Sequence, residues 1–314
     1  MASRVVTKPV RKAVMDFGTN TFHLFIADVF SDGTFRKVLH KKVTVKLGQG
    51  GIHKGFISPA AMQRGLNAAA KFREEMNRLK PSTAIAFGTS AIRDASNGST
   101  FSKILKRDYR IDLRIIDGNH EAELICHGVR HAVNLSGHRV LIMDIGGGST
   151  EFIICDDKKI HWKKSYKLGS SFMLEHFSPS DPFSKSDIQR MESHFNQTLM
   201  DLFAACNKYN PQSLVGSAGS FETFASMIYR RHPEAGRHYG KKSHSFEYAM
   251  LISLCKDLVT SNREARKVMP GLLQMRIDMI VPASLLLHYV LRKTKLKNTW
   301  MSAYSLKEGA LLTI

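Results

Sequence analysis

The chain has 314 residues and carries 46 Lys and Arg against 27 Asp and Glu, a formal net charge of +19. Its length suits two domains that each bury a core of their own, which excludes a small scaffold held together by disulfides or metal. Four scattered cysteines form no C-x-x-C pair, so neither a disulfide framework nor a zinc site is indicated. The positive field concentrates anions at the surface, which indicates a polyanionic partner.

The N-terminus does not resemble a secretory signal. The apolar stretch from Ala13 to Met15 is interrupted at once by Asp16, and no apolar run in the chain is long enough to span a bilayer. We therefore expect a cytoplasmic protein without a membrane partner. The basic residues gather in four clusters, none within a recognised nucleic-acid module, so no specific nucleic-acid partner is expected: Arg36–Lys42, Lys158–Lys164, Arg230–Lys242 and Arg292–Lys297.

The first structured segment, Ala13 to Ala27, is an apolar run, a turn of small and hydroxyl residues, and a second β-prone run. This pattern predicts a β-hairpin. The same pattern returns at Val140 to Ile154, where Asp144 stands in the place of Asp16, an offset of 144 − 16 = 128 residues.

A second pair of segments shares that offset. The segment Ala84–Arg93 corresponds to Leu214–Glu222, with Gly88 over Gly216, 216 − 88 = 128 residues further on. Two motif pairs at one spacing indicate a duplicated lobe.

Helical patterns lie between these motifs, and the clearest runs from Ala60 to Leu79 with apolar residues at helical intervals. The alternation of strands and helices predicts an α/β fold of two similar lobes, each a mixed sheet flanked by helices, with an active-site cleft between the lobes. We expect a hinge near a helix starting at Asn119, with lobes at residues 1–124 and 125–314, and residues 301–314 packing back on the first lobe.

Both hairpin turns are candidate phosphate sites. In the second, Gly146, Gly147, Gly148 and Ser149 follow Asp144, and glycines without Cβ let backbone N–H groups approach an oxyanion closely. Three glycines can equally form only a tight hairpin, and that interpretation is favoured for this turn taken alone. The matching turn, with Gly18, Thr19, Asn20 and Thr21, shifts the balance toward phosphate.

The charged residues beside these turns leave alternatives open. Asp16, Asp144 and Glu151 have the chemistry to hold Mg²⁺ through its water shell, or to cap the turns by hydrogen bonds. Arg93 has a guanidinium fork that fits phosphate oxygens, or it pairs with the neighbouring Asp94. Glu121 lies in the opening turn of the hinge helix. For a carboxylate in this position, sequence alone favours a stabilising interaction with the helix dipole over the role of general base.

These segments together resemble the exopolyphosphatase and guanosine pentaphosphate phosphohydrolase family, within the actin, sugar-kinase and chaperone ATPase fold, also described as a duplicated ribonuclease H-like fold. The resemblance runs nearly end to end. It is carried most strongly by five stretches: MDFGTNTFHLFIADV at Met15–Val29, VKLGQGG at Val45–Gly51, FGTSAIRDASNG at Phe87–Gly98, IIDGNHEAELICHGV at Ile115–Val129 and IMDIGGGSTEFII at Ile142–Ile154. Weaker members of the set are GSAGSFE at Gly216–Glu222, RIDMIVPA at Arg276–Ala283 and SLKEGAL at Ser305–Leu311.

The resemblance assigns roles to these residues. It implies that Glu121 is the catalytic base that activates water, against the preference from sequence physics. It places Asp144 and Glu151 among the magnesium-associated carboxylates and the two turns with Arg93 around phosphate. His120 departs from a position where the family usually has an acid, and Thr19 and Thr21 replace the usual serines but keep the hydroxyls. The chain resembles the short form of the family, without the C-terminal helical domain.

The implied activity is hydrolysis of the terminal phosphate of inorganic polyphosphate with Mg²⁺, in a protein for which a homodimer stays an option. Three alternatives remain open: a guanosine pentaphosphate (pppGpp) phosphohydrolase, a non-hydrolytic sensor of polyphosphate or nucleotide, and a sugar-kinase-like phosphotransferase. The charge surplus favours the polymer.

Overall fold

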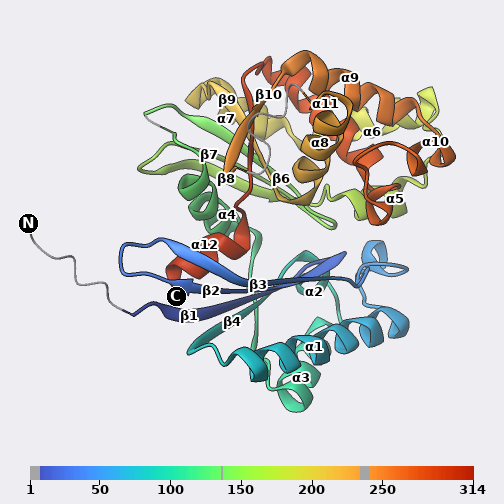
Figure 1. Ribbon diagram of the computed structural model, residues 1–314. Helices are drawn as coiled ribbons and strands as arrows, with labels where there is room; N and C mark the ends of the chain where they lie inside the picture. Colours follow the sequence, from blue (N-terminus) through green and yellow to red (C-terminus); the bar gives the residue numbers. More distant parts are fainter. Residues whose placement is uncertain (1–7, 136, 234–240) are drawn as a thin grey trace, which may run out of the picture. The chain divides into compact units, whose positions relative to one another are not determined.

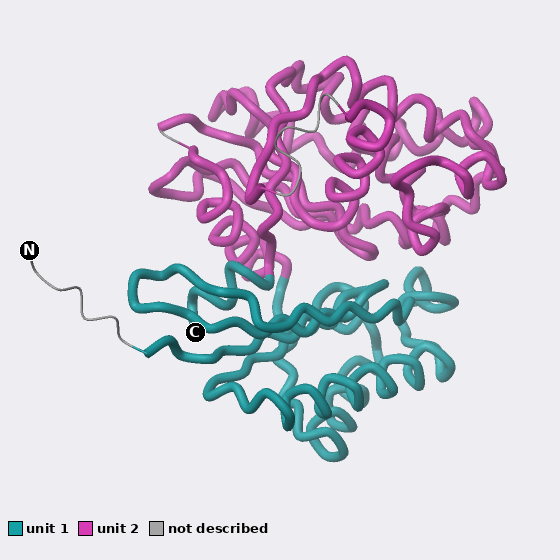
Figure 2. Tube along the Cα trace, in the orientation of Figure 1, with its two compact units in different colours: residues 1–117, 307–314 teal, residues 118–306 magenta. Residues whose placement is uncertain are grey.

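The computed structural model describes residues 8–135, 137–233 and 241–314. Positions 234–240 of the basic cluster Arg230–Lys242 lie outside these residues. The chain divides into two compact units, each with its own sheet: unit 1 comprises residues 1–117 and 307–314, and unit 2 comprises residues 118–306 (Figure 2).

The sheet of unit 1 has five strands in the order β3-β2-β1-β4-β5 (Figure 1). The first three strands form an antiparallel meander, and β4 runs parallel to both β1 and β5. The strand bounds are β1 Val10–Phe17, β2 Thr21–Val29, β3 Phe35–Thr44, β4 Thr83–Gly88 and β5 Leu113–Ile115.

One face of this sheet is apolar because alternate residues of each strand point to it. Ala13, Met15 and Phe17 of β1 lie in one buried cluster with Phe72 of α1 and Phe101 of α3, the two helices that cover this face (Figure 1). Ser58 caps α1 through a hydrogen bond from the Ala61 amide, and Pro59 occupies the first helical turn, where no N–H is needed. The helices of unit 1 are α1 Pro59–Leu79, α2 Ser90–Arg93, α3 Gly98–Tyr109 and α12 Leu306–Thr313, with a short 3₁₀ turn η1 at Ile52–Lys54.

The sheet of unit 2 has six strands in the order β10-β11-β9-β6-β7-β8. The strands β6, β7 and β8 form an antiparallel meander, while β9 is parallel to β6 and to β11. The edge strand β10 pairs antiparallel with β11. The strand bounds are β6 Val140–Ile145, β7 Thr150–Cys155, β8 Ile160–Tyr166, β9 Ser213–Ser217, β10 Ser243–Phe246 and β11 Thr299–Ser302.

The helices of unit 2 enclose a larger core than those of unit 1. Phe152, Phe195, Phe221 and Phe224 are fully buried in it, and α11 runs through it with nearly all its apolar residues buried. The helix bounds are α4 Gly118–Ala132, α5 Ser170–Phe177, α6 Lys185–Thr198, α7 Met200–Tyr209, α8 Ala218–Arg231, α9 Tyr248–Thr260, α10 Arg263–Lys267 and α11 Ile280–Thr294, with a 3₁₀ turn η3 at Gln274–Arg276.

The two sheets share one plan, which confirms the predicted fold of two mixed sheets flanked by helices. Strands β3-β2-β1-β4-β5 of unit 1 correspond in order and direction to β8-β7-β6-β9-β11 of unit 2, and β10 is an addition. The strand registers differ, however. Asp16 pairs with Phe87, whereas Asp144 pairs with Ser217 rather than with Val215, the residue 128 positions after Phe87. A shift of two residues keeps every side chain on its own face of the sheet.

The unit boundary falls between Asp117 and Gly118, whereas the expected boundary between residues 124 and 125 lies inside α4. A boundary there would cut one continuous helix that packs against β7 and β8. The end of the chain is also divided. Strand β11 belongs to the sheet of unit 2, and only residues 307–314 belong to unit 1, where the Ile314 carbonyl accepts a hydrogen bond from the Lys12 ammonium.

Candidate functional site

The turn between β6 and β7 is tied down through its carbonyl groups. The Gly146 carbonyl accepts from the Ser170 amide (3.0 Å), the Gly147 carbonyl from the Ser171 and Phe172 amides (2.9 and 3.0 Å), and the Gly148 carbonyl from the Gly169 amide (3.1 Å). The amides at the start of α5, which have no partner within their own helix, thus donate hydrogen bonds to the carbonyl groups of the turn.

Gly169 makes this arrangement sterically feasible. A Cβ atom at this position would overlap the backbone of Gly147 and Gly148. The Gly169 backbone itself is ordinary, with φ −72° and ψ 153°, so close approach rather than conformational freedom requires glycine here.

The tied carbonyls fix the direction of the amides in the turn. In a trans peptide the N–H points opposite to the carbonyl of the preceding residue. The N–H groups of Gly147, Gly148 and Ser149 are therefore directed away from α5. Successive backbone N–H groups on one side of a turn form the kind of concavity that binds anions.

The turn of unit 1 is held in the same manner by the loop that follows β3. The Asn20 carbonyl accepts from the amides of Val45 and Lys46 (both 2.9 Å), and the Thr19 carbonyl accepts from the Gly48 amide (3.1 Å). A Cβ at Gly48 would stand 2.7 Å from the Thr19 methyl group. The two predicted turns therefore share one construction, in which a glycine of a neighbouring segment presses on the turn.

A pair of hydroxyl groups links the turn of unit 1 to the start of α2. The buried Thr19 hydroxyl lies 3.0 Å from the hydroxyl of Ser90, the first residue of α2. Thr21, also buried, begins β2. In unit 2 the buried Thr150 hydroxyl donates to the Leu168 carbonyl (2.8 Å). These hydroxyl contacts tie each turn to a neighbouring segment of its own unit.

Two carboxylates stand side by side next to the turn of unit 2. Asp144 and Glu151 are direct partners in the β6–β7 register, so their side chains share one face of the sheet, and both are buried. Each accepts a hydrogen bond from a serine: Ser217 Oγ donates to Asp144 Oδ2 (2.5 Å), and Ser165 Oγ donates to Glu151 Oε1 (2.6 Å). The serines fix the orientation of both carboxylates.

This pair fits a divalent cation of the magnesium type. Mg²⁺ is usually held by one or two carboxylates together with water and substrate phosphates, so it needs no third protein ligand. Within the described residues, no three His, Cys, Asp or Glu side chains are grouped closely enough to hold an ion by themselves. Asp16, the third predicted metal residue, lies in unit 1, on β1 opposite His23.

Glu121 lies in the first turn of α4 with 8% of its surface exposed. The helix begins tightly against β8, because a Cβ at Gly118 would lie 2.7 Å from Ser165 Oγ and would overlap the Ser165 Cβ. Ser165 is the residue that holds Glu151. The helix of the predicted base therefore starts beside the carboxylate pair of the same unit.

The side chains of His120 and Glu123, on either side of Glu121 in α4, are more exposed than that of Glu121. Half of the His120 side chain is exposed, and its Nδ1 lies 3.6 Å from Glu123 Oε2. The Lys163 ammonium pairs with Glu123 and holds the pKa of that carboxyl below its usual range. Glu123 thus belongs to an ion pair with β8, whereas Glu121 is the buried carboxylate of this helix.

Arg93, the last residue of α2, makes the ion pair that its sequence suggests. Its Nε lies 3.2 Å from Asp94 Oδ1, and its Nη1 donates to the Ile116 carbonyl (3.2 Å). Four-fifths of its side chain is buried. These contacts fix the guanidinium beside the end of β5, and a role toward phosphate stays a prediction.

Sequence reasoning did not single out Arg276, whose guanidinium is near enough to Asp144 to feel its charge. Its guanidinium rests against the backbone at the start of α8, where a Cβ at Gly219 would overlap it. Burial lowers the pKa of Arg276, while the charges of Glu222 and Asp144 act in the opposite direction. The Nε atom is buried without a hydrogen-bond partner among the described residues. Nothing in the sequence separates this arginine from the other basic residues except its place in the RIDMIVPA stretch.

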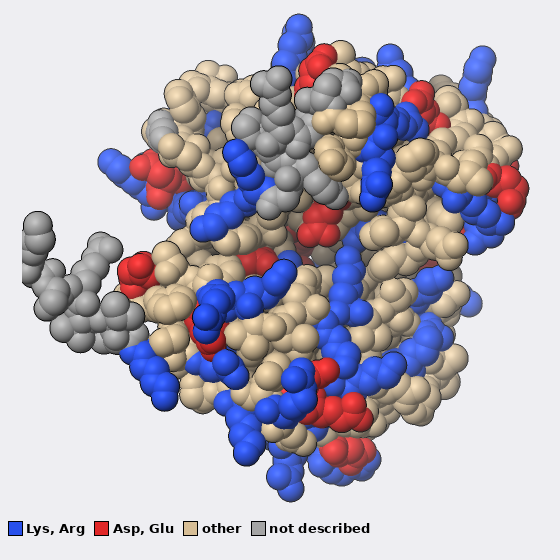
Figure 3. Space-filling view, viewed as in Figure 1, with Lys and Arg blue, Asp and Glu red and all other residues tan. Residues whose placement is uncertain are grey.

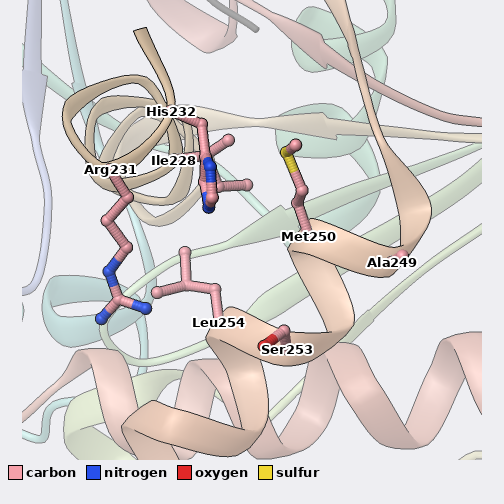
Figure 4. Close-up of a pocket in the computed structure, with 7 residues that line it drawn as sticks. All are labelled: Ile228, Arg231, His232, Ala249, Met250, Ser253 and Leu254. Carbon is pink, nitrogen blue, oxygen red and sulfur yellow. The ribbon is translucent and has the colours of Figure 1, made fainter. Parts of the chain in front are cut away.

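A cavity of about 220 Å³ lies elsewhere in unit 2, between α8 and α9 (Figure 4). It contains none of the predicted site residues. Met250 and Leu254 contribute apolar walls, and Arg231 at its rim pairs with Asp257 (2.7 Å). The cavity lies at the C-terminal end of α8, about 20 Å along the helix from the residues near Asp144. It is therefore separate from the candidate site.

A duplicated α/β fold with a glycine- and hydroxyl-containing turn in each half, both turns held through their carbonyl groups, is the arrangement predicted for proteins that handle phosphate groups. The chain belongs to the Ppx/GppA phosphatase family, whose family model matches residues 26–314. None of the helices in the described residues is long and apolar enough to cross a membrane.

Known proteins agree with this assignment. The crystal structure of an exopolyphosphatase from Cytophaga hutchinsonii is similar with a TM-score of 0.93 and 39% sequence identity, covering 96% of this chain and 97% of that one. A Ppx/GppA enzyme from Aquifex aeolicus shares the fold, with a TM-score of 0.80 at 22% identity and coverages of 97% and 99%. A guanosine-5'-triphosphate,3'-diphosphate pyrophosphatase of Aliivibrio fischeri is 27% identical over 222 residues, which are 71% of this chain and 44% of that relative.

Proposed function

We propose that the protein is an exopolyphosphatase, which removes the terminal phosphate of inorganic polyphosphate by hydrolysis. The turn of each unit binds phosphate oxygens through its backbone N–H groups. Glu121 accepts a proton from a water molecule, whose oxygen attacks the terminal phosphorus. The bond from that phosphorus to the bridging oxygen breaks, and the shortened chain leaves.

Asp144 and Glu151 are the residues that would hold Mg²⁺. When bound, the ion neutralises charge on the phosphate oxygens, which is the main requirement of phosphoryl transfer. Ser217 and Ser165 keep both carboxylates oriented by donating hydrogen bonds to them. The charge surplus of +19 attracts a polymeric anion toward the protein. On the face shown in Figure 3, Lys and Arg side chains cover more of the surface than Asp and Glu.

A single observation carries the proposal. The contacts Gly118–Ser165 and Ser165–Glu151 hold the start of α4, the helix that carries the buried Glu121, against the strand residue that orients Glu151. A buried carboxylate beside a phosphate site suits the role of general base, whereas an exposed carboxylate would only interact favourably with the helix dipole.

The test compares two substitutions on one helix. We expect Glu121→Gln to lower kcat for phosphate release from polyphosphate by about 10²–10⁴-fold, the usual contribution of a general base. Glu123→Gln makes the same chemical change two residues away, on the carboxylate that pairs with Lys163, and should leave kcat within a few fold. Activity should also vanish with EDTA and return with added Mg²⁺. Near-normal turnover by the Glu121 variant would remove this residue from the base role.

A second candidate is the hydrolysis of guanosine pentaphosphate. The observation that favours it is the similarity to the Aliivibrio fischeri pyrophosphatase, whose name describes a guanosine substrate. A side-by-side measurement of kcat/KM on polyphosphate and guanosine pentaphosphate decides between the two. A higher value on the nucleotide would replace the first proposal with the second.

A further inference from the structure

The two segments that brace the turns have the same three residues. Lys46, Leu47 and Gly48 follow β3 in unit 1, and Lys167, Leu168 and Gly169 follow β8 in unit 2. Each glycine presses on its turn, as described above. Both leucines are fully buried, each in the core of its own unit. The leucine and the glycine therefore fix the backbone of the preceding lysine beside the turn.

Both lysines are exposed. Lys46 has a φ of +50°, a left-handed conformation that costs a non-glycine residue free energy, and its amide donates to the Asn20 carbonyl of the turn (2.9 Å). The Lys167 ammonium lies 5.2 Å from the ring centre of Phe172, whose amide donates to the Gly147 carbonyl. Each lysine is thus linked by one or two contacts to an anion-binding turn.

These two lysines differ from nearby lysines in that they form no ion pair with a carboxylate among the described residues. Lys41 pairs with Glu75, Lys163 with Glu123 and Lys164 with Asp201. Across residues 8–135, 137–233 and 241–314, by contrast, neither Lys46 nor Lys167 has a carboxylate within ion-pair distance. Their positive charges are therefore available to a mobile anion.

We infer that Lys46 and Lys167 are equivalent polyanion-binding residues, one beside each turn. Each binds the polyphosphate groups that adjoin the phosphate held by its own turn. The inference rests on the proposed function and extends it to substrate choice. A single phosphate group is satisfied by a turn, whereas a chain of phosphates carries further charges that need cations. The two lysines would therefore favour a polymer over a substrate with one phosphate.

The experiment uses alanine variants of the full chain with matched controls. Lys46→Ala and Lys167→Ala are compared with Lys37→Ala and Lys158→Ala, which remove the same charge from exposed lysines of β3 and of the β7–β8 connection, away from the turns. We expect KM for long-chain polyphosphate to rise roughly three- to tenfold for each of the first pair, with kcat within twofold. The slope of log KM against log salt should fall by about 0.7 for each lysine removed. The controls should leave both quantities unchanged.

Binding is also measured without turnover, by titrating long-chain polyphosphate into the Glu121→Gln protein with and without the two substitutions. This separates the two proposals. If the unsubstituted protein binds polyphosphate but releases no phosphate, the hydrolase is overturned, and the affinities of the lysine variants still test the two lysines. Lys→Arg at both positions should retain most of the affinity. The inference is overturned if the double alanine variant binds polyphosphate as the unsubstituted protein does, or if the control pair weakens binding equally.

Discussion

The substitution Gly169→Ala tests the brace on the turn of unit 2. The added Cβ would overlap the backbone of Gly147 and Gly148, so the start of α5 and the turn must move apart. Because the Gly169 backbone has φ −72° and ψ 153°, alanine adopts it without strain, and the effect is steric alone.

The magnitude follows from the bonds at risk. Four amides of residues 169–172 donate to the carbonyls of residues 146–148. At about 1 kcal/mol net for each hydrogen bond, loss of two to four of them costs about 2–4 kcal/mol of folding free energy. For a unit of this size that corresponds to a fall in Tm of roughly 5–10 °C. Under the proposed function, reorientation of even one N–H group that binds phosphate should lower kcat by about 100-fold.

The assay combines thermal unfolding with phosphate release. Ser170→Ala is the comparison, because it removes only the side-chain bond from Ser170 Oγ to the Gly146 carbonyl (3.2 Å) and keeps all four backbone bonds. It should cost about 1 kcal/mol or less. A Gly169→Ala protein with the Tm and kcat of the unsubstituted chain would refute the argument that close packing on α5 orients the turn.

Two further predictions concern unit 2. Hydroxyl hydrogen bonds from Ser184 and Ser180 hold the pKa of Asp187 well below its usual range, so this carboxylate stabilises the protein above about pH 4, the unfolded-state value, and the contribution is lost as the pH falls through the folded-state pKa. Asp187→Ala should therefore cost about 1–2 kcal/mol in denaturant unfolding at pH 7 and progressively less below pH 4, and an equal cost at pH 7 and pH 3 would contradict this. Arg276→Ala should weaken competitive inhibition by inorganic phosphate roughly tenfold, because hydrogen bonds to a charged group are worth about 1.5–3 kcal/mol, and Arg276→Lys should recover only part of it. Unchanged inhibition by phosphate would show that Arg276 serves only to pack the start of α8.

The elements with strong local signals were predicted well from the sequence. The two hairpins appear as β1–β2 and β6–β7, and the helix expected from Ala60 to Leu79 appears as α1, one residue longer. Alternating apolar residues and turn glycines are encoded within a few positions, so a single stretch of sequence is enough to recognise them.

The contacts that complete the candidate site were not visible in the same way. The brace of Gly169 on Gly147 joins residues 22 positions apart, 169 − 147, and the need for glycine there comes from a close approach between two segments rather than from a turn conformation. The two-residue shift in strand register likewise has no counterpart in the motif spacing. One signal was available, because the repeated Lys-Leu-Gly triplet at positions 46–48 and 167–169 marks both braces.

The path of the chain through unit 1 has a consequence for synthesis. Ribosomes make proteins from the N-terminus, and domains generally fold as units while this proceeds. Unit 2 ends at Leu306, the first residue of α12, so it emerges before the rest of that helix, whose Ala310 and Leu311 are completely buried. Unit 1 therefore cannot complete its fold until its final helix is made, whereas unit 2 can already fold before that point. A nascent chain stopped at residue 305 should accordingly protect unit 2 from protease more fully than unit 1.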